Sequence, residues 1–189
     1  MADEESRPGG AEVDHRAHAV QKILRQTARH EAGHAVAVVV RGGYLEELLF
    51  VDPHFADQTA IRTGIARHRT PDEHQPFVTF AGPWAQAKWM VEHDPDVDDF
   101  DEALDFAWEW DGAEVDLDSD AARYVQRFAD LAQGTDHSVD SRQWEIAWME
   151  ELEGLWPVIT EVAILMLSSR VTHAMVEEVL RRQTMVPTE

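Results

Sequence analysis

The sequence predicts a mainly α-helical (α+β) domain with a small β element of two or three strands. Long segments carry apolar residues at helical spacing, two short segments are typical of strands, and glycine or proline falls where segments should end. We expect a flexible N-terminal tail over residues 1–14, which are polar and acidic, and a single domain over residues 15–189. A domain of this length can bury a substantial core.

The first helix should run from Ala17 to Val40, because apolar residues keep a helical period until Arg41-Gly42-Gly43 supplies a stop. Pro157 should kink the last helical region or begin a new segment, and the chain should break again near Thr172. The seven tryptophans mostly follow helical spacing and are expected in the core. The other expected elements are strands at 44–52 and 59–68, and helices beginning at 75 and spanning 116–132 and 141–182.

The composition limits the classes of partner. With 16 Lys and Arg against 37 Asp and Glu, the formal net charge is −21, which disfavours binding to nucleic acid or to anionic membranes. No apolar window is long enough to cross a bilayer, and the N-terminus is unlike a signal peptide, so we expect a cytoplasmic protein. Because the chain has no cysteine, any bound zinc must be held by His, Asp or Glu.

The segment His30-Glu31-Ala32-Gly33-His34 lies inside the first predicted helix and has the spacing of a zinc hydrolase motif. Residues four apart share a helix face, so His30 and His34 can direct two imidazoles at one zinc ion. Glu31 would then lie beside the metal as a general base. Two helical histidines can also be solvated or satisfied within a core; the small Ala32-Gly33 pair and the apolar helix favour the metal site.

A third ligand should come from the acidic region downstream. Fourteen Asp and Glu residues occur between positions 92 and 120, and most of them are expected on solvated surfaces. A catalytic zinc site needs a third protein ligand and an open fourth position. Composition does not choose among four candidates, which are Glu114, Asp116, Asp118 and Asp120.

Five segments, in order, resemble the zinc peptidase domain of FtsH-type AAA proteases. They are His30 to Val36, the two strand pieces Leu48 to Asp52 and Gly64 to Ala66, then Phe80 to Gln86, Gly112 to Leu117, and the C-terminal helices from Trp156 to Leu180. The resemblance implies a helical zincin-like fold, a Zn²⁺ cofactor, His30, His34 and Asp116 as metal ligands, and Glu31 as general base. The sequence departs from the family pattern at Pro83 and Val115, and the acidic link before Gly112 is longer.

The chain contains no GxxxxGK[ST] phosphate loop, so no ATPase module is encoded here. We therefore expect a zinc metalloendopeptidase that hydrolyses unfolded or short polypeptides without using ATP itself. A partner protein or a homo-oligomer could deliver or enclose the substrate, and the strand at 59–68 could bind an extended peptide along its edge. The spare histidines His54, His68, His74 and His93 are expected at the surface.

Two other functions remain open from the sequence. The first is a catalytically silent zinc-binding regulatory or interaction module derived from a peptidase. The second is an acidic metal-binding or decoy protein, in which the acidic region matters more than the histidine pair. An intact Glu31 favours the enzyme, because a purely structural site needs only its ligands.

Overall fold

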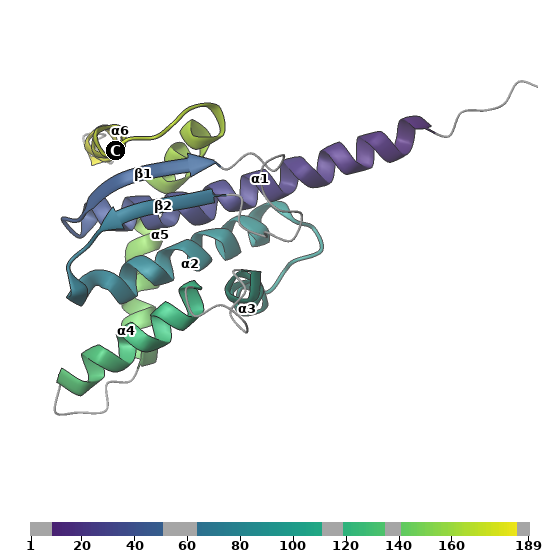
Figure 1. The fold of residues 1–189 in the computed structure, drawn as a ribbon. Helices are drawn as coiled ribbons and strands as arrows, with labels where there is room; N and C mark the ends of the chain where they lie inside the picture. The colour runs from purple at the N-terminus through teal and green to yellow at the C-terminus, as the bar shows by residue number, and fades with distance from the viewer. Residues whose placement is uncertain (1–8, 51–63, 111–118, 135–140, 185–189) are drawn as a thin grey trace, which may run out of the picture.

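The structure is a computed structural model and describes residues 9–50, 64–110, 119–134 and 141–184. These residues form a mainly helical domain with a small antiparallel sheet, as predicted (Figure 1). The elements in order are α1 (Gly9–Val40), β1 (Tyr44–Phe50), β2 (Gly64–Arg69), the 3-10 turn η1 (Asp72–His74), α2 (Gln75–His93), α3 (Phe100–Trp110), α4 (Asp120–Gly134), α5 (Ser141–Ser168) and α6 (His173–Thr184).

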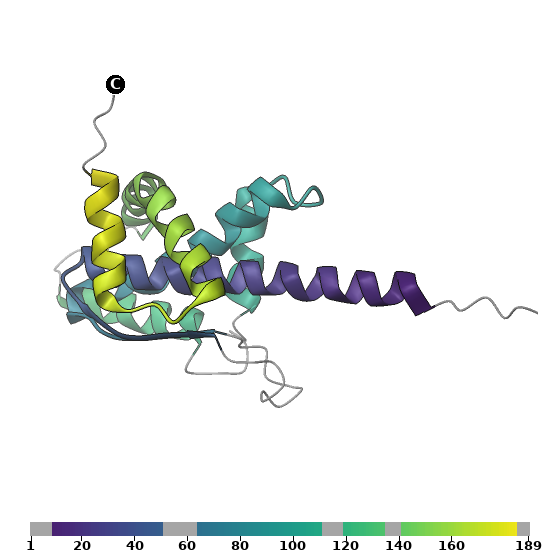
Figure 2. The same cartoon turned by 90° about the horizontal axis from the view of Figure 1, so that it is seen from above.

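Helix α1 is the central element and carries the histidine pair. It begins at Gly9, so residues 9–14, which we expected in the flexible tail, are helical. Its early turns project beyond the rest of the described chain (Figures 1 and 2). It ends as predicted: Gly42 has φ 71°, and the amides of Gly42 and Gly43 donate to the carbonyls of Val39 and Val38 at 3.0 and 2.8 Å. This Schellman arrangement satisfies the last carbonyls of the helix.

Strands β1 and β2 confirm the two predicted strand regions, although residues 51–63 lie outside the described part of the chain. The strands pair antiparallel from Tyr44 opposite Arg69 to Phe50 opposite Gly64, and Leu48 forms an isolated bridge with Val171. Within the described residues, β2 therefore has β1 on one edge and no further strand on the other. The sheet lies along α1 (Figure 1).

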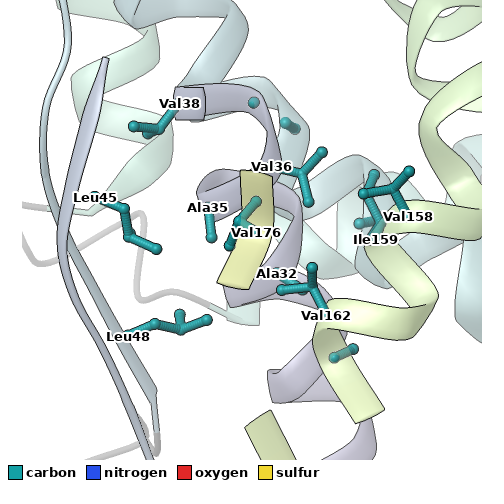
Figure 3. Close-up of a cluster of buried hydrophobic side chains, with 14 of the residues drawn as sticks. Ala32, Ala35, Val36, Val38, Leu45, Leu48, Val158, Ile159, Val162 and Val176 are labelled. Atoms are coloured by element: carbon teal, nitrogen blue, oxygen red, sulfur yellow. The ribbon is translucent and has the colours of Figure 1, made fainter. Parts of the chain in front are cut away.

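The core fills the space between the sheet, α1 and α5. Small and β-branched residues of α1 face Leu45 and Leu48 of β1 on one side and the valines and isoleucine of α5 on the other (Figure 3). Helix α2 packs closely along another face of α1. A Cβ atom on Gly33 would lie 2.3 Å from the carbonyl oxygen of Ala81, so only glycine permits this approach of the two helices.

The remaining helices partly follow the predictions. Helix α2 begins at Gln75 as expected, and α5 runs from Ser141 through Pro157, which does not begin a new segment. The predicted break near Thr172 separates α5 from α6. Helix α3 was not predicted, because its acidic residues were assigned to a solvated surface; its buried Ala103 and Ala107 pack inward. Among the tryptophans expected in the core, Trp84 and Trp89 are buried, whereas Trp108, Trp144, Trp148 and Trp156 are half-buried.

In the described part of the chain, no helix combines the length and the apolar character that a membrane crossing requires.

Candidate metal centre

Three ligand atoms from two helices converge at one point. His30 and His34 lie one turn apart on α1, and Asp120 is the first residue of α4. The Nε2 atoms of the two histidines are 3.1 Å apart, and Asp120 Oδ2 lies 3.0 Å from His30 Nε2 and 2.8 Å from His34 Nε2. Both histidines are buried, with 7% of their surface exposed. The structure thus brings together the predicted histidine pair and one of the four carboxylates left open by the composition.

The other ring nitrogens are held by acceptors on α2. His30 Nδ1 donates to Gln86 Oε1 at 2.9 Å, and His34 Nδ1 donates to the carbonyl oxygen of Val78 at 2.7 Å. An imidazole that donates from Nδ1 keeps a lone pair on Nε2 when it is neutral. Partners of this kind fix the orientation of metal-binding histidines. Both rings are therefore oriented to offer Nε2 to a cation.

Helix α2 is adapted locally to this role. Gln86 is a buried polar residue in an otherwise apolar helix, with only 1% of its surface exposed. Pro83 lies inside α2 and has no amide to donate to the carbonyl of Thr79, the residue after Val78.

A positive charge at the centre of the cluster, from a proton or a metal ion, stabilises the carboxylate of Asp120 beside the two imidazoles. Burial lowers the pKa of His34, but the charge and hydrogen bond of Asp120 outweigh this and raise the pKa to about 9. Burial raises the pKa of Asp120, but the two histidines hold it well below its usual range. Two imidazole lone pairs and a carboxylate oxygen would repel one another without a proton or a metal ion between them.

The donor set and its spacing fit zinc. Zinc binds nitrogen and oxygen at about 2.0–2.1 Å, and a point at that distance from all three atoms lies roughly 1 Å outside their plane. A metal ion at that point would have the three protein atoms at three vertices of a tetrahedron around it, and the fourth vertex would be open. Two histidines and one carboxylate with an open fourth position are typical of a catalytic zinc site. Among the described residues, His30, His34 and Asp120 form the grouping able to hold a metal ion.

Asp120 reaches this position because of how α4 begins. Ser119 is fully buried and its Oγ accepts from the amide of Ala122 at 3.2 Å, as an N-cap residue does. Asp120 is therefore in the first turn, where the helix dipole stabilises a carboxylate. The sequence prediction began this helix at Asp116. Asp116, the ligand implied by the resemblance, lies outside the described residues, as do Glu114 and Asp118.

A cleft of about 1070 Å³ opens over the cluster. Its lining includes Glu31, the predicted general base, and five consecutive residues of β2 from Gly64 to His68. Glu31 lies close enough to His34 to contribute to the raised pKa of that histidine. A Cβ atom on Gly64 would lie 2.6 Å from Glu31 Cγ, so the absence of a side chain there makes room for the glutamate. The carboxylate, the metal ligands and the strand thus share one cavity.

One of the spare histidines does not lie free at the surface. His68 is half-buried in the cleft wall, with its Nδ1 2.9 Å from Thr70 Oγ1. Burial and the positive charge of His34 lower its pKa to about 4, so the ring is neutral at pH 7. His93 is exposed as expected, His74 is half-buried, and His54 lies outside the described residues. His68 differs from the other spare histidines in lying near the end of β2, a strand that lines the cleft.

Replacing Gly82 with alanine should weaken metal binding. A Cβ atom there would lie 2.2 Å from His34 Nε2, so the ring or the helix must move. Because the displaced atom is the ligand itself, we expect zinc affinity to fall about 10- to 100-fold, as when the support of a metal ligand is lost. Competition with a chromophoric chelator would measure this.

Gly154→Ala is the matched control, because a Cβ atom at this glycine of α5 meets nothing within 4 Å. That variant should keep wild-type zinc affinity and gain some helix stability. Equal zinc affinity of Gly82→Ala and the wild type would contradict the position assigned to His34.

Comparisons of this chain with protein-family models, with curated proteins and with solved structures gave no match. The site is therefore described by its own geometry: two buried histidines and a partly buried aspartate line a cleft that also contains a glutamate.

Proposed function

We propose that this protein is a zinc-dependent metallopeptidase whose metal ligands are His30, His34 and Asp120. The observation that carries the proposal is the convergence of three ligand atoms, spaced 2.8 to 3.1 Å apart, in a cleft that also holds Glu31. A site with only a structural role is usually closed by four protein ligands, whereas this one combines three ligands with a cavity.

The roles of the residues follow from their positions. When bound, zinc would supply Lewis acidity, polarising the scissile carbonyl and lowering the pKa of water. Glu31 accepts the proton of the attacking water and passes it to the departing amine nitrogen. Gln86 and the Val78 carbonyl keep the two imidazoles in the orientation that presents Nε2. The cleft gives a peptide access to this group of residues.

Strand β2 is the element best placed to bind the peptide backbone. Residues Gly64 to His68 line the cleft, and in the described part of the chain the edge of β2 away from β1 has no strand beside it. An extended substrate can add to such an edge through main-chain hydrogen bonds. Unfolded or short polypeptides would fit this mode because their backbones are free to pair.

Kinship with the peptidase domain of FtsH-type AAA proteases is part of the proposal. This relationship rests on the order of the five sequence segments and on the helical fold with a small sheet. If it holds, we expect a cytoplasmic location and either a partner protein or a homo-oligomer. The proposed ligand set differs from the family alignment in placing Asp120 where the alignment suggests Asp116.

Peptidase activity that depends on zinc would test this function. The zinc-loaded protein should cleave members of an internally quenched peptide library, lose activity with a chelator and regain it with zinc. His34→Ala should be inactive under the same conditions. If the protein binds zinc but cleaves no library member, the catalytically silent binding module becomes the better description.

A further inference from the structure

The cleft is less acidic than the chain as a whole. Its lining carries three arginines, Arg67, Arg123 and Arg127, against three carboxylates, Glu31, Glu46 and Asp120. Asp120 contacts the two histidines, and Glu46 is paired with Arg69. In a chain of net charge −21, a cavity in which arginines and carboxylates are equal in number is relatively rich in positive charge.

Two of these arginines, Arg123 and Arg127, lie on the same face of α4 as the metal ligand Asp120. Arg123 and Arg127 follow Asp120 by three and seven residues on α4, so all three lie on one side of the helix. At 1.5 Å per residue, Arg123 and Arg127 are about 6 Å apart along the helix axis. Side chains on one face of an extended peptide recur at roughly 6.6 Å. The two spacings agree closely enough for Arg123 and Arg127 to contact two peptide side chains that are two residues apart.

Two arginines of the cleft, Arg127 and Arg67, make ion pairs that are weak enough to be exchanged. Arg127 lies 4.0 Å from Asp72, whose side chain is 91% exposed, and Arg67 pairs with Glu47 at 3.0 Å while 61% exposed itself. Exposed pairs of this kind contribute little stability. A substrate carboxylate can therefore replace the Asp72 partner of Arg127 at small cost.

We propose that the cleft selects peptides with acidic side chains at alternate positions on one side of the scissile bond, bound by Arg123 and Arg127. This rests on the proposed peptidase function, of which it specifies the substrate class. A short acidic peptide is recognised by close contacts inside the cleft, where the repulsion of the distant acidic surface is screened by salt. A long polyanion such as nucleic acid would meet that surface along its length.

The test uses internally quenched peptides that share one apolar core. Each carries Glu-x-Glu, Gln-x-Gln or Lys-x-Lys on one side of the core or on the other. Cleavage is measured as kcat/KM with the zinc-loaded wild type. Binding of the same peptides is measured separately by fluorescence anisotropy with zinc-loaded Glu31→Gln.

On one of the two sides, Glu-x-Glu should be bound and cleaved roughly tenfold better than Gln-x-Gln, and Lys-x-Lys least well. Arg123→Gln and Arg127→Gln should each reduce the preference by roughly threefold, and the double variant should abolish it. Arg181→Gln, which removes the same charge from α6 outside the cleft, should leave it unchanged. Raising the salt concentration should weaken the preference.

The outcomes separate the two proposals. Cleavage at equal rates for all three peptide sets, or a preference that survives in the double variant, would overturn the acidic selectivity while leaving the peptidase. Arginine-dependent binding of Glu-x-Glu peptides without cleavage of any peptide would support the acidic site and overturn the peptidase.

Discussion

Glu31→Gln should reduce kcat by about 10²- to 10⁴-fold and leave zinc bound, since this is the range of rate that a general base supplies. Glutamine has nearly the same shape and fits the space that Gly64 leaves beside residue 31. It cannot accept the proton of the attacking water. Because Glu31 is not one of the three converging ligands, zinc affinity should change little. Steady-state cleavage and a zinc titration on the same preparation would measure both quantities.

Glu46→Gln is the matched control for this variant. Glu46 also lines the cleft, but its carboxylate pairs with Arg69 on the neighbouring strand. Its loss should leave kcat within a few-fold of the wild type. A Glu31→Gln enzyme with wild-type kcat would rule out Glu31 as the base. A wild type that binds zinc and cleaves nothing would instead favour the silent binding module.

Asp120→Ala should lower zinc affinity by at least about 100-fold, because it removes a charged ligand and leaves the two imidazoles without their anionic partner. The loss should exceed that of Gly82→Ala, which only displaces a ligand. Competition with a chromophoric chelator gives the dissociation constant. Circular dichroism of the metal-free protein would show whether α4 still folds, since Ser119 continues to cap it.

Asp116→Ala is the informative comparison for this prediction. The family resemblance implies Asp116 as the ligand, whereas Asp120 is the carboxylate that lies 2.8 Å from His34 Nε2. We expect Asp116→Ala to bind zinc like the wild type. The reverse result, strong loss in Asp116→Ala and none in Asp120→Ala, would replace Asp120 by Asp116 in the site.

The sequence was most informative where local patterns decide the structure. The apolar period of α1, the Gly42-Gly43 stop and the two strand segments are local signals, and all of them are confirmed. Helix α3 was missed because its acidic residues suggested a solvated surface. Its apolar residues nevertheless repeat at helical spacing, which was the available local signal: Phe100, Ala103, Leu104, Ala107 and Trp108.

The candidate site shows the same division. His30, Glu31 and His34 are fixed by spacing within one helix, so the sequence could predict them together. Asp120 lies 86 residues from His34, and its selection depends on where α4 begins. Ser119 before an alanine-containing helical segment was the available sign of that start. The contacts of Gln86 and Gly82 with the histidines depend on the packing of α2 against α1, which no short motif encodes.

The most direct test of the metal centre is the zinc content of the purified protein, measured by elemental analysis beside His34→Ala. The wild type should contain about one zinc per chain, and the variant should contain little or none after the same supplementation with zinc. Absence of zinc from the supplemented wild type would contradict the centre formed by His30, His34 and Asp120, and with it the proposed hydrolase.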